Sequence, residues 1–251
     1  MNKLPSITLA FWIMKICATT LGETAGDLLS MTLNVGYAIS SLILLAVFVF
    51  TLVLQLFSNG YNPVLYWIVI LSTSTAGTTL SDFMDRTLGL GYATGSLVLI
   101  AILLAIFAAW RWSGETLNVT RIRGFRGEMF YWMAILISNT LGTALGDYLA
   151  DDSGLGFAGG ALLIGSTIAV VALARYFTRI PGVLLFWLAF VLTRPFGATL
   201  GDFLTKPHAK GGLDFGTIGS SAVLAAVLVV MIVGASYAQR RYVRREVAEL
   251  S

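Results

Sequence analysis

Four aspartates in matching surroundings divide the chain into four similar units. They are separated by 55, 65 and 55 residues, and they are Asp27, Asp82, Asp147 and Asp202. Self-similarity of this kind indicates a repeat architecture, in which each unit buries its apolar face against its neighbours. The spacing also groups the four units into two halves, with a longer connection between the second and the third.

Three further columns of residues repeat with the aspartates. Fifteen residues before each one stands a tryptophan: Trp12, Trp67, Trp132 and Trp187. Five residues before stands a glycine: Gly22, Gly77, Gly142 and Gly197. Directly before stands a small residue: Gly26, Ser81, Gly146 and Gly201. A glycine–aromatic pair then opens the next apolar segment in three copies (Gly36–Tyr37, Gly91–Tyr92, Gly156–Phe157), whereas the fourth has Asp214–Phe215 and three extra residues.

The composition places these repeats in a lipid bilayer. Hydrophobic residues make up 57% of the chain and charged residues 12%, which is about half of the charged share of a soluble domain. Each apolar segment has about 20 residues or more, enough to cross roughly 30 Å of hydrocarbon as a helix. The segments are 6–27, 34–57, 62–85, 90–112, 127–149, 155–177, 181–204 and 214–238.

We therefore predict an all-α polytopic membrane protein with eight transmembrane helices, arranged as four parallel two-helix repeats. The predicted parts are 1–112 for repeats one and two, 113–127 for a connecting loop, 128–239 for repeats three and four, and 240–251 for a basic tail. Parallel repeats are related by an axis along the membrane normal. Four equivalent helices could surround such an axis.

The distribution of lysine and arginine predicts the orientation. One side of the membrane would carry Lys3, Arg111, Arg121, Arg123, Arg126, Arg175, Arg179, Arg240, Arg241, Arg244 and Arg245, and the other only Arg86, Lys206 and Lys210. By the positive-inside rule, both termini and the middle loop lie in the cytoplasm. The tryptophans would then form an aromatic belt at the inner interface, with the aspartates about 22 Å further along.

The repeated acids predict a binding site for a small cation. An acid in the bilayer costs about 2.5–3.5 kcal/mol on insertion scales, so a repeated one should face protein, water or an ion. Carboxylate, hydroxyl and amide oxygens suit Mn²⁺, Mg²⁺, Ca²⁺ or Na⁺, and they do not suit copper or zinc. The predicted ligands are Asp27, Asp82, Asp147, Asp202, Glu23, Thr20, Thr24, Thr79, Asn139 and Thr199. Lys15 and Arg194, deep in their segments, are predicted charge-balancing groups.

Other interpretations of the same residues stay open. The glycines form GxxxG-like pairs that let helices pack closely, and an aspartate near a helix end can simply reach water or cap a segment. The chain could be a non-transporting scaffold, sensor or assembly factor whose aspartates make interhelical contacts. It could also transport an anion held by Lys15 and Arg194.

An enzyme is not expected. The sequence has no Ser/His or Cys/His pair, no phosphate loop and no intramembrane aspartyl protease pattern, and its one cysteine (Cys17) and one histidine (His208) exclude a disulfide or a His-rich metal cluster. The basic run from Arg240 to Arg245 is too short for nucleic-acid binding and indicates contact with anionic lipid.

The repeated Trp-x9-Gly-x3-small-Asp segment, followed by a glycine–aromatic helix, resembles the bacterial membrane-anchored proteins made of a repeat of unknown function. The likeness covers nearly the whole chain, and it implies a bacterial inner-membrane protein with a fourfold internal repeat. It implies no activity.

From the residues we predict a transporter, or exporter, of a small hard cation, with a divalent metal such as manganese as first choice and protons as a candidate exchange partner. The expected partners are the bilayer and a small inorganic ion, with no nucleic acid and with homo-oligomers left open.

Overall fold

The chain folds entirely into helices and short turns. The structure, a computed structural model, describes residues 3–122 and 124–250, and the side chains up to Gln239. The predicted basic side chains Arg123, Arg240, Arg241, Arg244 and Arg245 lie outside this description. The helices are α1 (Leu9–Asp27), α2 (Tyr37–Phe57), α3 (Pro63–Asp82), α4 (Tyr92–Trp112), α5 (Phe125–Asp147), α6 (Gly156–Phe177), α7 (Gly182–Thr205) and α8 (Thr217–Leu250).

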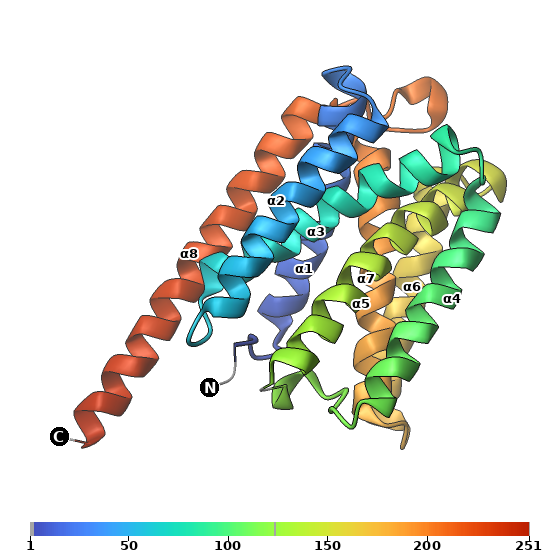
Figure 1. The fold of residues 1–251 in the computed structure, drawn as a ribbon. Helices are drawn as coiled ribbons and strands as arrows, with labels where there is room; N and C mark the ends of the chain where they lie inside the picture. Colours follow the sequence, from blue (N-terminus) through green and yellow to red (C-terminus); the bar gives the residue numbers. More distant parts are fainter. Residues whose placement is uncertain (1–2, 123, 251) are drawn as a thin grey trace.

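Among the described helices, seven are long and apolar enough to cross a membrane, which are α2 to α8. The prediction of eight spans is therefore confirmed for seven. The exception is α1, whose hydropathy is lowered by Lys15, Glu23 and Asp27. These three side chains are buried in the protein, because α1 packs against α3, α7 and α8 in the middle of the bundle (Figure 1).

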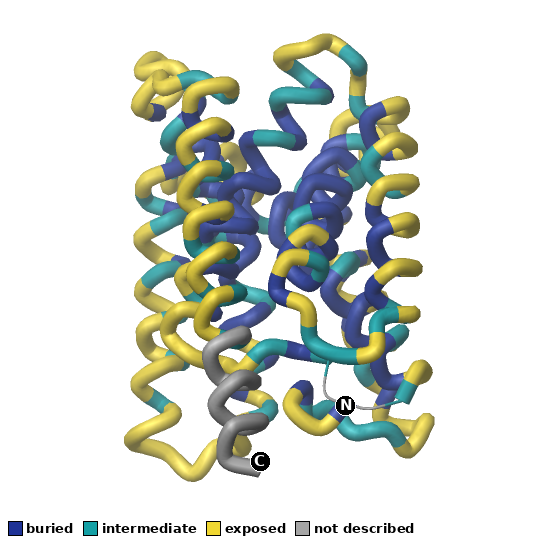
Figure 2. Tube along the Cα trace, turned by 90° about the vertical axis from the view of Figure 1, so that its left-hand side faces the viewer, coloured by how far each residue is buried: buried dark blue, intermediate teal, exposed yellow. Residues whose placement is uncertain are grey.

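The four odd-numbered helices form a closed ring, and the even-numbered helices surround it. In this four-helix ring α1 contacts α3, α3 contacts α5, α5 contacts α7, and α7 returns to α1. Each even helix packs on the odd helix of the following repeat: α2 on α3, α4 on α5, α6 on α7 and α8 on α1. Burial follows the same plan, since buried residues gather on the inner helices and exposed ones on the outer helices (Figure 2).

The repeated glycines allow the ring helices to approach closely. A Cβ added to Gly77 would lie 2.8 Å from the carbonyl carbon of Asn139 and 2.9 Å from the amide nitrogen of Thr140, which is closer than atoms can pack. The same conflict with the next ring helix would arise at Gly22, Gly26, Gly142 and Gly197. The small residues of the repeat therefore serve as helix-packing positions, as in other membrane bundles.

The turn after each aspartate separates the fourth repeat from the others. In each of the first three repeats a π-helical turn follows the aspartate directly. These turns are η1 (Leu28–Thr32), η2 (Phe83–Thr87) and η4 (Tyr148–Asp152). In the fourth, α7 continues to Thr205 and a 3₁₀ turn, η5 (His208–Lys210), leads towards α8. A second 3₁₀ turn, η3 (Val119–Arg121), lies in the connecting loop.

The glycine of the predicted glycine–aromatic pair is retained in all four repeats. Gly36 and Gly91 precede α2 and α4 with φ of 81° and 72°, a region that favours glycine. Gly216, with φ of 71°, holds this place before α8. It stands 14 residues after Asp202, whereas Gly36 stands nine after Asp27. The fourth copy thus lacks the aromatic residue and carries a longer turn, but it keeps the glycine.

The predicted tryptophan belt is instead part of the protein interior. Trp67, Trp132 and Trp187 are buried, and each packs against an aromatic ring of the preceding repeat. The ring centroids lie 5.7 Å apart for Phe11–Trp67 and Tyr66–Trp132, 6.0 Å for Tyr131–Trp187 and 5.8 Å for Phe186–Trp12. We call these eight residues the aromatic collar. It closes one end of the four-helix ring, the tryptophan end, and the aspartates mark the opposite aspartate end.

Candidate metal centre

All four repeat aspartates are buried at the aspartate end of the ring. Together with Glu23, one turn before Asp27, they place five carboxylates from four helices in one region, and none of the five residues is more than 4% exposed. Because each aspartate stands at the same register of its ring helix, the close packing of the helices brings the carboxyl groups towards the common axis. Burial without counter-charges would be very unfavourable.

Lys206 links the aspartates of the first and fourth repeats. Its Nζ donates a hydrogen bond to Oδ2 of Asp27 at 2.6 Å and lies 3.1 Å from Oδ1 of Asp202. Burial alone would lower the pKa of Lys206, but the carboxylates of Asp202 and Asp27 outweigh this effect and raise the pKa above its ordinary value. Lys206 therefore stays protonated as a bridge between the two acids.

Arg86 makes the equivalent bridge between the second and third repeats. Its Nε lies 3.0 Å from Oδ1 of Asp82, and its Nη2 donates to Oδ2 of Asp147 at 3.1 Å. The guanidinium group also lies over the rings of Tyr37 and Tyr92, at 5.9 and 5.6 Å from their centroids. The aromatic residues of two glycine–aromatic pairs thus hold this arginine in place.

A further ion pair lies next to the aspartates, between Arg194 and Glu23. Nη1 of Arg194 lies 2.9 Å from Oε2 of Glu23, and both residues are buried. Nη2 of Arg194 donates to the hydroxyls of Thr78 at 2.6 Å and Thr143 at 2.7 Å. Thr143 in turn donates to Glu23 at 3.1 Å. The network joins one residue from each ring helix and crosses the axis.

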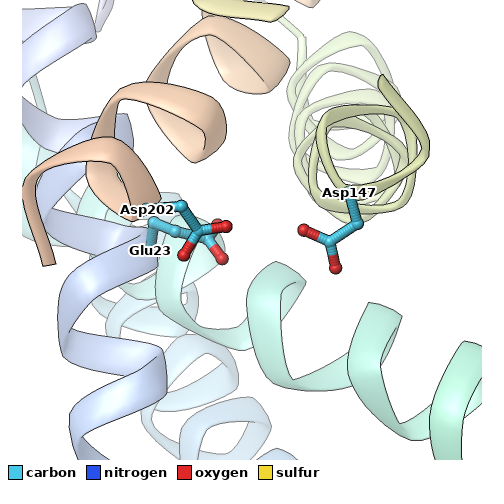
Figure 3. Close-up of side chains that lie close together, drawn as sticks. All are labelled: Glu23, Asp147 and Asp202. Carbon is cyan, nitrogen blue, oxygen red and sulfur yellow. The ribbon is translucent and has the colours of Figure 1, made fainter. Parts of the chain in front are cut away.

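Three of the carboxylates converge closely enough to share a metal ion. Glu23, Asp147 and Asp202 each offer one oxygen, and these oxygens all lie within 4.8 Å of one another. Figure 3 shows Asp202 and Glu23 side by side, with the carboxylate of Asp147 directed towards them from across the site. Opposite oxygens around Ca²⁺ lie about 5 Å apart and those around Mg²⁺ about 4.2 Å. The three acids therefore present a donor set of the right kind and size for a hard divalent cation.

The two predicted charge-balancing groups have different surroundings. Arg194 pairs with Glu23, as described above. Lys15 lies deeper, where its Nζ donates to Oδ1 of Asn139 at 3.4 Å and stands 4.2 Å above the ring of Phe190. No ion pair between Lys15 and a carboxylate occurs in the described part of the chain. Asn139, a predicted ligand, is engaged with Lys15 and with Thr73, so the structure places it away from the acids.

The predicted threonine ligands bond to helix carbonyls or to a neighbouring helix. Thr20, Thr79 and Thr199 donate to the carbonyls of Ile16, Ala76 and Pro195 in their own helices. Thr24 faces α8, where it accepts a hydrogen bond from Ser221. As ligands these residues stay predictions, and the structure brings none of them into a hydrogen bond with the acids among the described contacts.

Sequence reasoning missed four residues that contact the acids. Thr78 and Thr143 stand four residues before their aspartates, in the register of Glu23, so alignment on Glu23 would have found them. Arg86 and Lys206 stand four residues after Asp82 and Asp202, and the sequence placed them only on the less basic side of the membrane. The i,i+4 spacing of opposite charges was the available signal.

Fold and site together define a polytopic membrane protein with a fourfold two-helix repeat and a buried acidic cluster. The chain matches the family model described as Repeat of Unknown Function (DUF347) four times, at residues 10–61, 65–116, 130–180 and 185–242. These matches cover most of the chain, so it belongs to this family. No curated protein and no solved structure matches the chain.

Proposed function

We propose that this protein binds a small hard divalent cation at the aspartate end and moves it across the membrane. The observation that carries the proposal is the convergence of Glu23, Asp147 and Asp202, whose oxygens lie within 4.8 Å of one another while their residues are at most 4% exposed. Buried acids in a membrane protein mark ion pathways more often than structural contacts, because placing them there is costly.

The charge balance of the site favours a divalent ion. Five carboxylates take part in the ion-pair network, and three cationic groups face them: Arg86, Arg194 and Lys206. Two negative charges remain within the network, and one divalent cation neutralises them. Oxygen donors without sulfur or imidazole select Mn²⁺, Mg²⁺ or Ca²⁺ over zinc or copper, and Mn²⁺ stays our first choice.

The arrangement of the repeats supports a path along the common axis. Lys15 and Arg194 reach across the axis from α1 and α7, and the aromatic collar closes the tryptophan end. Transport therefore requires the two halves of the ring to move against each other, as in other transporters built from parallel repeats. Proton exchange during this movement remains part of the proposal.

We further propose that the tryptophan end faces the cytoplasm of a bacterial cell. The basic residues Arg111, Arg121, Arg175 and Arg179 lie at or just beyond the ends of helices there. α1 begins and α8 ends on the same side of the bundle (Figure 1). The positive-inside rule then places the acidic cluster nearer the outer surface.

The test is Mn²⁺ flux into proteoliposomes that contain a Mn²⁺-quenched dye. Asp147→Asn and Asp202→Asn remove ligand charge, and we expect each to lower the flux by about tenfold or more, since even outer-shell changes alter metal affinity 10–100-fold. Asp151→Asn is the matched control, because Asp151 is exposed in the turn after Asp147. Wild-type flux in both site variants would reject transport through this site, and wild-type protein with no more flux than protein-free liposomes would reject transport itself. Absence of flux with the wild-type protein, together with a lower stability of the two site variants, would instead favour the scaffold interpretation, in which the aspartates are interhelical contacts.

A further inference from the structure

Each of the three converging carboxylates is already engaged by a cation of the protein itself. Glu23 faces Arg194 at 2.9 Å, Asp147 accepts from Arg86 at 3.1 Å, and Asp202 lies 3.1 Å from Lys206. A metal ion that enters the site therefore competes with these groups for the same carboxylates. The three cations differ in burial, since the side chain of Arg194 is 0% exposed, that of Lys206 is 21% exposed and that of Arg86 is 32% exposed.

The two less buried cations, Lys206 and Arg86, each have a second carboxylate outside the converging three. Lys206 also contacts Asp27, and Arg86 also contacts Asp82. For Lys206 the contact with Asp27 is the hydrogen-bonded one, at 2.6 Å. The contact with Asp202 is close but lacks hydrogen-bond geometry, because the buried Oδ1 of Asp202 has no hydrogen-bond partner. Lys206 can thus release Asp202 and stay paired with Asp27.

Arg86 can likewise pair with either of two carboxylates, those of Asp82 and Asp147, but here the contact outside the converging three is not the hydrogen-bonded one. Its Nη2 donates to Asp147 and its Nη1 to the hydroxyl of Tyr37 at 3.3 Å, whereas its contact with the buried Oδ1 of Asp82 is an ion contact without hydrogen-bond geometry. Tyr37 and Tyr92 hold the guanidinium from the sides, so it can turn towards Asp82 without leaving its position. Lys206 has no aromatic ring beside it among the described contacts, and its Nζ also lies 4.0 Å from the sulfur of Met31.

We propose that Lys206 and Arg86 are tethered competitors that set the selectivity of the metal site. In the absence of metal they occupy Asp202 and Asp147. When a divalent cation binds to Glu23, Asp147 and Asp202, they withdraw to Asp27 and Asp82. This inference rests on the proposed function and explains why the site has more acids than ligands. Two acids bind the displaced cations, and an ion with a single charge competes poorly against the tethered groups.

The test is Mn²⁺ binding by purified protein in detergent, measured from the electron paramagnetic resonance signal of free Mn²⁺. Lys206→Met should bind Mn²⁺ at least about tenfold more tightly than wild type, because one competing unit charge near the ion is gone. Lys210→Met is the matched control, since Lys210 is an exposed lysine in the same connection, and it should bind as wild type does. Arg86→Gln should shift affinity in the same direction as Lys206→Met.

A second comparison uses Asp27, which binds the displaced lysine in this account. Asp27→Asn should weaken Mn²⁺ binding in wild type, because Lys206 then has only Asp202 as a partner. In the Lys206→Met background the same substitution should have little effect. If Asp27 acts by binding Lys206, the effect of Asp27→Asn depends on Lys206. If Asp27 were instead a direct ligand of Mn²⁺, its loss would weaken binding in both backgrounds.

The outcomes distinguish the inference from the proposed function. If folded wild-type protein binds no Mn²⁺, both the proposed function and the tethered-competitor inference are wrong. If wild type binds Mn²⁺ and Asp147→Asn and Asp202→Asn lose it, while Lys206→Met and Arg86→Gln bind as wild type, only the tethered-competitor inference falls. Gel filtration and circular dichroism of each variant establish that it is folded, and Lys206→Gln replaces Lys206→Met if the latter aggregates.

Discussion

The two ends of the four-helix ring follow the same repeat but differ in symmetry. At the tryptophan end every repeat supplies an aromatic pair, and contacts pass from each repeat to the next around the whole ring. At the aspartate end every repeat supplies an acid, but only the second and fourth supply a base four residues later. Met31 and Asp151 hold that position in the first and third. The aromatic contacts are fourfold, and the bases after the aspartates are twofold.

This difference shows which part of the repeat has specialised. Apolar and aromatic contacts are only weakly directional, so four equivalent units can close a ring without change. A charged site cannot keep four equivalent acids without neutralising them. Four charged residues that break the fourfold pattern and join the ion-pair network lie towards the aspartate end: Glu23, Arg194, Arg86 and Lys206. Specialised chemistry is therefore expected there, and structural closure at the tryptophan end.

The largest effect on stability is expected for Arg194→Gln. The change leaves the buried carboxylate of Glu23 without its charge partner and removes hydrogen bonds to Thr78 and Thr143. Breaking a buried pair costs about 3–5 kcal/mol. The loss in the free energy of unfolding is measured by denaturant unfolding, followed by circular dichroism. The double variant Glu23→Gln with Arg194→Gln should recover part of the loss, and a double variant as unstable as Arg194→Gln would show that the ion pair does not matter.

An intermediate effect is expected at the seams that join the two ends. Gly77→Ala would push α3 away from the backbone of Asn139 and Thr140, and overpacking of this kind costs about 1–3 kcal/mol. Mn²⁺ binding should weaken together with stability, because the same seam positions Asp82 and Asp147. Gly219→Ala is the control, as nothing lies within 4 Å of a Cβ at that position. Equal stability of the two variants in a thermal melt would contradict the close-packed ring.

The smallest effect is expected in the aromatic collar. The hydroxyls of Tyr66 and Tyr131 are 2.7 Å apart in the interior, so Tyr66→Phe removes one hydrogen bond at a cost of about 1 kcal/mol. The double variant with Tyr131→Phe should be closer to wild type in the same unfolding assay. Neither change should alter Mn²⁺ affinity. A clear loss of Mn²⁺ affinity would contradict the assignment of a structural role to the tryptophan end and of ion binding to the aspartate end.

The fold was largely predictable from the repeat, and the site only in part. The register of Asp27, Asp82, Asp147 and Asp202 predicted parallel helices, and their burial follows from that register. The order of packing around the ring, with each even helix on the following repeat, was not predictable, because lipid-facing and protein-facing apolar residues look alike in sequence. For the same reason the tryptophans suggested an interfacial belt.

Side-chain partners were the least predictable feature. Lys15 and Arg194 are both deep in their segments, yet only Arg194 meets a carboxylate. The distinction depends on which face of α1 and α7 points towards the axis, and a helix surrounded by protein has no polar face that marks it. Arg86 and Lys206 lie just beyond the apolar segments, so the sequence placed them only on one side of the membrane, whereas each forms an ion pair with the acid four residues before it.

The most direct test of the account is to locate the ion. Crystals grown with Mn²⁺ and measured at the manganese absorption edge give the metal position from its anomalous scattering. The account predicts one site between the carboxylates of Glu23, Asp147 and Asp202, with Lys206 on Asp27 and Arg86 turned to Asp82. Manganese bound only at surface acids such as Asp151 and Asp152, with Lys206 and Arg86 still on Asp202 and Asp147, would contradict it.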